Sequence, residues 1–306
     1  MALLSSILTF IFITIVSVTG VYILTGLTGM FSLGQASFMA LGSYVSAILV
    51  TKLGVPFVPA CTIAVIVSVL IGFIVGLPTV RLRRDYISLV TLGFGEAITA
   101  LLNQFTSLTG GASGYTGIPK ITNLTIAGVS AFVCIALAAY FKNSKYGRQC
   151  IAVRNDELAA KAMGINAPRV KMIAFLTSVA VTAFSGCLYA FFTTYVDPTL
   201  FGWKKSADWI IMVFFGGSNS LTGSILGTFL LSGMPEVMRV LSEYRSVVYA
   251  VLVLLIINFK PTGLLGEWEL TIKNLKALFS HKKPNDDGTI SADTSEESNN
   301  DVAVRS

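Results

Sequence analysis

Long apolar runs occupy most of this chain and leave it few ways to fold. No charged residue occurs in the first 51 positions, and further apolar runs follow up to Phe259. A helix needs about 20 apolar residues to cross the hydrocarbon core, and backbone groups in lipid must pair within helices or closed barrels. The sequence therefore predicts an all-α integral membrane protein, a polytopic helical bundle of about nine transmembrane segments that include broken helices. The expected segments are Ser6–Leu24, Gly26–Ala47, Pro56–Pro78, Tyr86–Phe105, Thr125–Phe141, Met172–Phe192, Ala207–Phe215, Ile225–Val240 and Ser246–Phe259.

One long polar segment, Lys142–Lys171, interrupts these runs. It contains seven basic residues and two acidic ones, Asp156 and Glu157. An excess of Lys and Arg beside membrane spans marks a cytoplasmic loop. Inside it we expect a short helix of about 12 Å, with Asn155 as its N-cap and Gly164 in the left-handed position after its last turn. A solvated loop whose charges only orient the chain is the simpler interpretation.

Three polar positions inside the expected spans are candidates for a transport path. Glu96 lies about ten residues into its span, where an ionisable group is costly and usually faces protein or water. Its alternative role is a structural hydrogen bond to a neighbouring helix. Ser32 and Gln35 lie in the glycine-rich stretch Gly26–Ala47. Small residues there favour tight helix packing, and a helix broken beside the transport path is the second possibility.

The C-terminal part divides by composition into three stretches. We expect a transmembrane domain over 1–266 that includes the loop 142–171. An amphipathic segment on the inner membrane surface follows over 267–283, because its apolar residues recur at helical spacing. A polar, disordered cytoplasmic tail is expected over 284–306.

Several function classes are disfavoured. The four cysteines have no paired spacing, so neither a disulfide nor a metal site is expected, and no cofactor is expected either. No Gly-Lys dipeptide occurs, which excludes the usual phosphate-binding P-loop. The net charge of +6 comes from basic residues beside the spans, which argues against nucleic-acid binding. No paired catalytic constellation is visible within the spans, so an enzyme is not expected.

Six motifs in fixed order resemble the LivM-type permeases of branched-chain amino acid ABC importers. They are GLTGMFSLGQASFMALGSY, TLGFGEAI, LTGGASGYTGIP, GRQCIAVRNDELAAKAMGIN, GGSNSLTGSILG and KPTGLLG. The fourth motif also resembles the EAA loop that docks permeases onto their ATPases, although Leu158 separates Glu157 from the two alanines. Gln35 stands where His is common, and Asn219, Ser220 and Ser224 replace the usual Gly, Thr and Pro.

The resemblance implies a non-catalytic permease subunit in the plasma membrane of a prokaryote, with the loop and the C-terminus in the cytoplasm. Its implied partners are a second related permease, two cytoplasmic ATPases, an extracellular or periplasmic substrate-binding protein and membrane lipid. ATP hydrolysis by the partners would drive alternating access. The residues that would couple the chain to the ATPases are Gly147, Arg148, Arg154, Asn155, Glu157, Ala159, Ala160 and Gly164.

Three other functions remain open from the sequence. An importer subunit for urea, short amides or another small solute would carry the same motifs. A secondary transporter or channel would work without an ATPase. An intramembrane enzyme is the third. The substrate bound by the cognate binding protein and copurification with an ATPase would discriminate among them.

Overall fold

The computed structural model describes residues 2–82 and 84–237, together with residues 254, 259, 260, 263, 264 and 266. These residues all belong to the first of two compact units, Met1–Glu269. The described part is helical and contains no strand, only an isolated bridge between Tyr115 and Val196. The expected segments 267–283 and 284–306 lie outside the described residues.

Six helices in the described ranges are long and apolar enough to cross a membrane. They are α1 (Ala2–Thr28), α2 (Gln35–Leu53), α3 (Phe57–Thr79), α4 (Arg84–Gln104), α6 (Leu124–Asn143) and α9 (Ala167–Thr193). A further pair, α10 (Trp203–Gly216) and α11 (Leu221–Val237), is bent by 120° and counts as a seventh candidate span.

The first six expected spans thus each match one helix, and the two expected half-spans form the bent pair. The expected last span, Ser246–Phe259, lies almost wholly outside the described residues. The largest boundary error is in the second span, which begins at Gln35 and not at Gly26, whereas the sixth begins at Ala167, five residues before the expected Met172.

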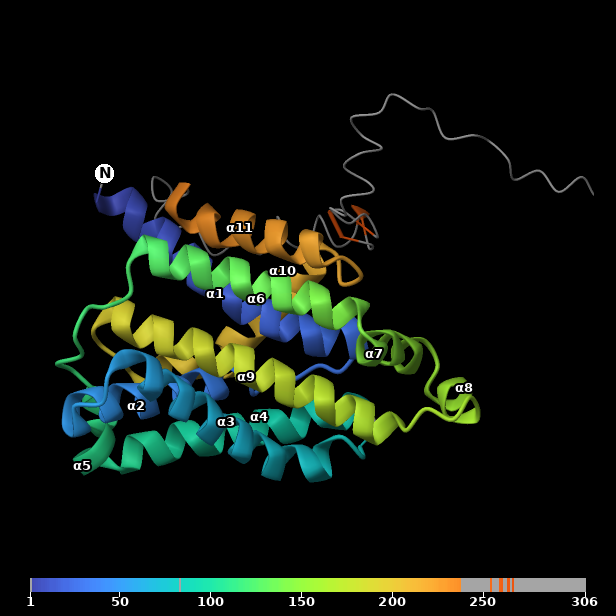
Figure 1. Ribbon diagram of the computed structural model, residues 1–306, viewed down its shortest axis with the longest axis horizontal. Coiled ribbons are helices and arrows are strands. Elements are labelled where there is room, and N and C mark those ends of the chain that lie inside the picture. The colour runs from blue at the N-terminus through green and yellow to red at the C-terminus, as the bar shows by residue number, and fades with distance from the viewer. Residues whose placement is uncertain are drawn as a thin grey trace, which may run out of the picture. The chain divides into compact units, whose positions relative to one another are not determined.

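Helix α9 lies at the centre of the bundle and packs against α1, α2 and α3 (Figure 1). Small residues allow these helices to approach closely. A Cβ atom at Gly42 of α2 would lie 2.1 Å from the carbonyl oxygen of Ala183, and one at Gly186 of α9 would lie 2.0 Å from that of Met39. Glycine is therefore required at both crossings, and tight packing explains part of the glycine-rich stretch.

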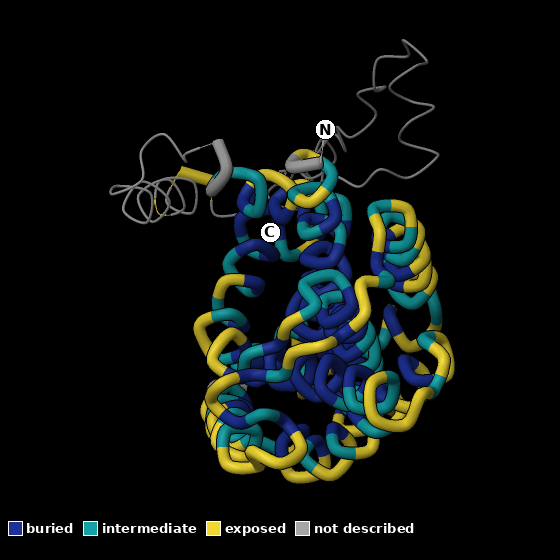
Figure 2. Tube along the Cα trace, turned by 90° about the vertical axis from the view of Figure 1, so that its left-hand side faces the viewer, coloured by how far each residue is buried: buried dark blue, intermediate teal, exposed yellow. Residues whose placement is uncertain are grey.

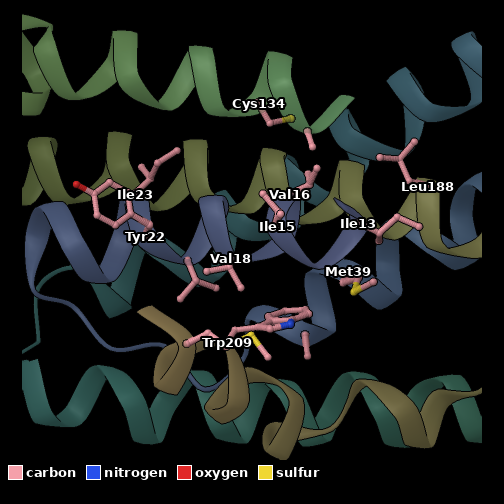
Figure 3. Packing of buried hydrophobic residues seen from close by; sticks show 14 of the residues in the cluster. Ile13, Ile15, Val16, Val18, Tyr22, Ile23, Met39, Cys134, Leu188 and Trp209 are labelled. Atoms are coloured by element: carbon pink, nitrogen blue, oxygen red, sulfur yellow. The ribbon is translucent and has the colours of Figure 1, made fainter. Parts of the chain in front are cut away.

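Buried residues concentrate along the middle of the bundle, and exposed ones follow its outer helices (Figure 2). In the most apolar stretch of α1, 78% of the residues are buried, whereas the share is 22% in α4 and in α6. The central apolar cluster brings together Val18 of α1, Met39 of α2 and Trp209 of α10 (Figure 3). Three separate stretches of the chain thus share one core.

The two ends of the bundle carry different short elements (Figure 1). One end, here called the α7/α8 end, carries α7 (Lys145–Asn155) and α8 (Glu157–Ala162). The opposite α5 end carries α5 (Thr106–Thr109) and the 3₁₀ helix η1 (Gly111–Ser113), and a second 3₁₀ helix, η2 (Pro198–Phe201), precedes α10. Four glycines near α5 have positive φ, which agrees with the turn-rich loop in the motif LTGGASGYTGIP.

Candidate functional site

The polar loop folds into two short helices that meet at Asp156. Ser144 caps α7 by accepting a hydrogen bond from the backbone N–H of Gly147. Asp156 caps α8 by accepting from the N–H groups of Leu158 and Ala159 at 2.8 and 3.0 Å. The expected cap was therefore misplaced by one residue, because Asn155 is the last residue of α7. Gly164 has φ +79°, as expected for the residue that follows the helix.

Several predicted coupling residues hold the loop against the bundle. Arg154 donates a hydrogen bond from Nη1 to the carbonyl oxygen of Gly26, near the end of α1. Arg148 donates from Nη1 to the carbonyl of Asn143 at 2.6 Å. A Cβ atom at Gly147 would lie 2.2 Å from the carbonyl oxygen of Phe141, so only glycine fits the corner between α6 and α7. These contacts fix the position of α7.

Glu157 links α8 to the central helix α9. Its Oε2 accepts a hydrogen bond from Nζ of Lys171 at 2.6 Å, and its Oε1 lies 3.0 Å from Nζ of Lys161. Lys171 is only 2% exposed and belongs to the first turns of α9. Partial burial tends to raise the pKa of Glu157, but the hydrogen bonds from Lys171 and Lys161 outweigh it and lower that pKa below its ordinary value. The carboxylate thus joins the two helices.

Two large apolar side chains are exposed on α8 and on the residue that follows it, beside the half-exposed Lys161. Leu158 is 78% exposed and Met163 83% exposed, whereas Ala160 packs inward against Val153 and Ala167. Ala159 is exposed beside Leu158. In Figure 1, α8 projects beyond α7 at this end of the bundle. Two large apolar side chains on a projecting helix form a surface suited to a protein groove.

The second polar region is the break between α1 and α2, residues 29–34. Gly20 of α1 packs against Thr182 of α9, and Thr182 donates a hydrogen bond from Oγ1 to Oε1 of Gln35 at 3.4 Å. Gly20 lies eight residues, hence about 12 Å, before the end of α1. Because Gln35 is the first residue of α2, that helix begins inside the bundle. The stretch Gly26–Ala47 is therefore divided between the end of α1, an irregular connection at residues 29–34 and α2, and a break beside a transport path stays a prediction.

Neighbouring helices supply hydrogen bonds to the broken segment. Ser206 of α10 accepts from the N–H of Ala36 at 2.9 Å. Thr91 of α4 accepts from the N–H of Leu33 at 3.1 Å, and Ser88 donates to the carbonyl of Phe31 at 3.0 Å. Irregular backbone at membrane depth requires such partners. These hydroxyl groups were not identified from the sequence, since single serines and threonines in apolar runs carry no local signal.

The structure brings two of the three path candidates together and separates the third. Ser32 and Gln35 both lie at the break and are 1% and 0% exposed. Glu96 lies on the exposed face of α4. Its neighbour Gly95 packs near Ser37 in the first turn of α2, so Glu96 is at the same level of the bundle. The burial of Lys171 was also missed, because this lysine was interpreted only as part of the basic excess.

Lys142 is a further contact that the sequence did not reveal. Its Nζ donates to the carbonyl of Asn219 at 3.0 Å and lies 5.9 Å from the ring centroid of Tyr22. The bend between α10 and α11 is thereby joined to the start of the polar loop. Within the described ranges, no group of three or more His, Cys, Asp or Glu residues could hold a metal ion.

Comparison with known proteins identifies one group of similar sequences. Residues 3–257 match the family model described as "Branched-chain amino acid transport system / permease component". The chain is 32% identical over 280 residues to the high-affinity branched-chain amino acid transport system permease protein LivM of Salmonella typhimurium, a match that covers 80% of this chain and 66% of that protein. The chain thus spans just under two thirds of the length of this relative.

Two more distant relatives carry related names. The permease protein LivH of Salmonella typhimurium is 25% identical, over 80% of this chain and 88% of its own length. A probable LivM permease of Methanocaldococcus jannaschii is 25% identical, over 67% of this chain and 68% of its own. No solved structure gives a significant match.

Proposed function

Because the chain belongs to the family of branched-chain amino acid transport permeases, we propose that it is a membrane subunit of an ATP-driven importer for these amino acids. The subunit is non-catalytic, and ATP is hydrolysed by partner ATPases in the cytoplasm. An extracellular or periplasmic binding protein delivers the substrate. Hydrolysis changes which side of the membrane the path faces, and this requires that substrate affinity differ between the two states.

The observation that best supports this function is the attachment of α8. This helix offers Leu158 and Met163 to a partner and is held on its inner side by the ion pair between Glu157 and Lys171. Lys171 belongs to α9, which packs against three other spans. A displacement of α8 by an ATPase would therefore reach the centre of the bundle. Gly147, Arg148 and Arg154 act in this proposal by fixing α7. Asn155, Ala159, Ala160 and Gly164 shape α8 and its ends.

Exposed faces of the spans differ in a way that supports pairing with a second permease. Exposed residues of α3 include Leu70, Phe73 and Ile74, which are bulky and suit lipid. The middle of α4 instead exposes Gly93, Glu96 and Ala97. Small residues permit close helix contact, and a carboxylate at this depth is costly in lipid. The face of α4 therefore suits a protein neighbour and a polar path.

In this proposal, Ser32, Gln35 and Glu96 contribute to the substrate path. The proposed permease domain covers 1–266, with the α7/α8 end and the C-terminus in the cytoplasm, and the excess of Lys and Arg in the α7/α8 end supports this orientation. About nine crossings follow if Ser246–Phe259 forms the last span. The host membrane is the plasma membrane of a prokaryote.

Uptake by the reconstituted complex tests the function. The full chain is copurified with its partner permease and ATPases, placed in proteoliposomes, and supplied with the binding protein and labelled leucine. We expect uptake that requires ATP. Uptake of urea or a short amide in place of leucine would assign the chain to a different importer. Leucine transport by the chain alone, without nucleotide hydrolysis, would overturn the proposal.

A further inference from the structure

The start of α2 has hydrogen-bond donors that lack acceptors. Nε2 of Gln35 and Oγ of Ser32 have no hydrogen-bond partner in the described part of the chain, although both residues are almost completely buried. A buried polar group without a partner is costly, and most such groups in folded proteins are paired. The described part of the chain therefore leaves these two groups without an acceptor.

Four other buried side chains in the described ranges also have a polar atom without a partner, namely Asn103, Thr122, Ser178 and Trp209, but of the six only Ser32 and Gln35 lie at the break between α1 and α2. Nearby hydroxyl groups are bonded: Ser206 to the N–H of Ala36, Thr91 to the N–H of Leu33, and Ser88 to the carbonyl of Phe31. The side-chain oxygen of Gln35 is also bonded, to Thr182. The neighbouring helices thus satisfy the backbone of the break, and two donor groups remain.

The same location is the positive end of a 19-residue helix. A hydroxyl or carboxylate side chain often caps such an end, but here the N-cap is Gly34, which makes no side-chain cap. A Cβ atom at Gly34 would lie 2.3 Å from the carbonyl oxygen of Thr91 on α4. The close approach of α4 therefore excludes a capping side chain at Gly34, and α2 has no acidic residue in its first turn.

We propose that the start of α2, with Ser32 and Gln35, binds the carboxylate of the transported amino acid. This inference rests on the proposed function and names the substrate group that is recognised. A carboxylate offers two acceptor oxygens and a negative charge, which complement two donors and the positive helix end. Neutral urea or a short amide lacks the charge, so the site distinguishes amino acids from these solutes.

Binding to the full chain in lipid nanodiscs tests the proposal. The probes are labelled L-leucine, with 4-methylpentanoate, which keeps the carboxylate, and leucinamide, which does not, as competitors. We expect 4-methylpentanoate to compete and leucinamide to be at least about tenfold weaker, since charge-assisted hydrogen bonds are the stronger ones. Equal competition by the two probes, or no binding of either carboxylate, would overturn the proposal.

Substitutions locate the site. Gln35→Glu keeps the size of the side chain but adds a negative charge, so leucine binding should fall at least about tenfold and the preference over leucinamide should disappear. Gln104→Glu, the same change at an exposed position of α4, should leave both unchanged. Ser32→Ala should weaken leucine binding, while Ser68→Ala should not, because Ser68 bonds its own helix at Ala64.

These outcomes separate the inference from the proposed function. If the complex takes up leucine with ATP while a folded Gln35→Glu variant binds leucine as the native chain does, the carboxylate site is wrong and the importer stands. If the chain binds carboxylates as expected but the complex shows no ATP-dependent leucine uptake, the site stands and the substrate or the energy source is wrong.

Discussion

Two polar regions of this bundle differ in whether their side chains find hydrogen-bond or ion-pair partners within the described part of the chain. At the α7/α8 end, the carboxylate of Glu157 meets two lysines, and Asp156 satisfies the first N–H groups of α8. At the start of α2, the amide nitrogen of Gln35 and the hydroxyl of Ser32 have no partner among the described residues. In the first region, the joint between α8 and α9, these polar groups are paired within the chain. The second lacks an acceptor.

The difference agrees with the roles proposed for the two regions, coupling at the first and substrate binding at the second. A joint that transmits force must hold the same geometry in every state, so both of its partners belong to the chain. A substrate site must release its ligand, so its partners are complete only when the ligand is present. Substitutions should therefore affect assembly and coupling at the first region, and ligand binding at the second.

The largest effect is expected from reversing the charge of Glu157. Glu157→Lys places a third ammonium group beside Lys161 and Lys171, and it leaves the buried ammonium group of Lys171 without its partner, which is strongly destabilising. We expect ATP-dependent leucine uptake to fall by at least about 100-fold. The loss is measured as the leucine uptake and the ATPase rate of the reconstituted complex.

The double variant Glu157→Lys with Lys171→Glu tests the pairing directly. It restores opposite charges across the joint, so uptake should recover in part relative to either single variant. Lys161→Gln is the control, because Lys161 is half exposed and surface pairs contribute little. If uptake by the double variant were no higher than uptake by the worse single variant, the ion pair with Lys171 would not be the reason that Glu157 is needed.

A smaller loss should follow from changing the apolar surface of α8. Replacing Leu158 and Met163 together by Ser removes large apolar side chains from a partner contact but exposes nothing new in the chain itself. We expect at least about tenfold weaker binding of the ATPase in copurification, as hot-spot residues cost over about 1 kcal/mol each, with unchanged thermal stability. Ala162→Ser on the same helix is the control. Full copurification by the double variant would move the ATPase contact away from α8.

Much of the fold could be predicted because span length and charge placement are local properties of the sequence. Six apolar runs gave six helices. The short helix after Asp156 was also predictable, since capping residues and a following glycine lie close together in sequence. The N-cap was misplaced by one residue because Asn155 and Asp156 are both good caps, and α7, which uses Asn155 as its last residue, was not expected.

The contacts of the site were harder to predict because they join distant segments. Lys171 and Glu157 are 14 positions apart, and nothing in the sequence distinguishes a buried lysine from a loop lysine. Ser206 and Ala36 are 170 positions apart. The composition of the stretch Gly26–Ala47 allowed both tight packing and a break. The structure shows tight packing at Gly42 and an irregular connection between two separate helices at residues 29–34. The role of each glycine depends on where α4 and α9 lie, which the local sequence does not show.

Serine substitutions provide a finer test of complete and incomplete polar groups. Ser17 donates to Ser185 at 2.8 Å, and Ser185 donates to the carbonyl of Thr182 at 2.7 Å. Ser185→Ala should therefore destabilise the chain by about 1 kcal/mol. Ser32→Ala removes a hydroxyl that has no partner in the described chain and should be neutral or slightly stabilising without ligand. Thermal unfolding of the purified chain measures the stability of both variants. Equal losses of stability in the two variants would contradict the distinction between paired and unpaired serines.

The smallest expected effect is the acid sensitivity of the Glu157 joint. Its pKa is lowered in the folded chain, because the lysine hydrogen bonds outweigh the effect of burial. A group with a lowered pKa stabilises the fold at pH values above its unfolded pKa, and this stabilisation is lost as pH falls through the folded value. The difference in thermal stability between the native chain and Glu157→Gln should therefore stay constant from neutral pH to the ordinary glutamate value of about 4.3, and shrink below it. If the difference in thermal stability instead vanished between neutral pH and about 6, a group with a histidine-like pKa would be its cause and not Glu157. The single histidine, His281, lies far from this joint in sequence. Since Gln35 and Ser32 carry no ionisable group, Gln35→Leu should change stability equally over the whole range, which again separates the joint from the site.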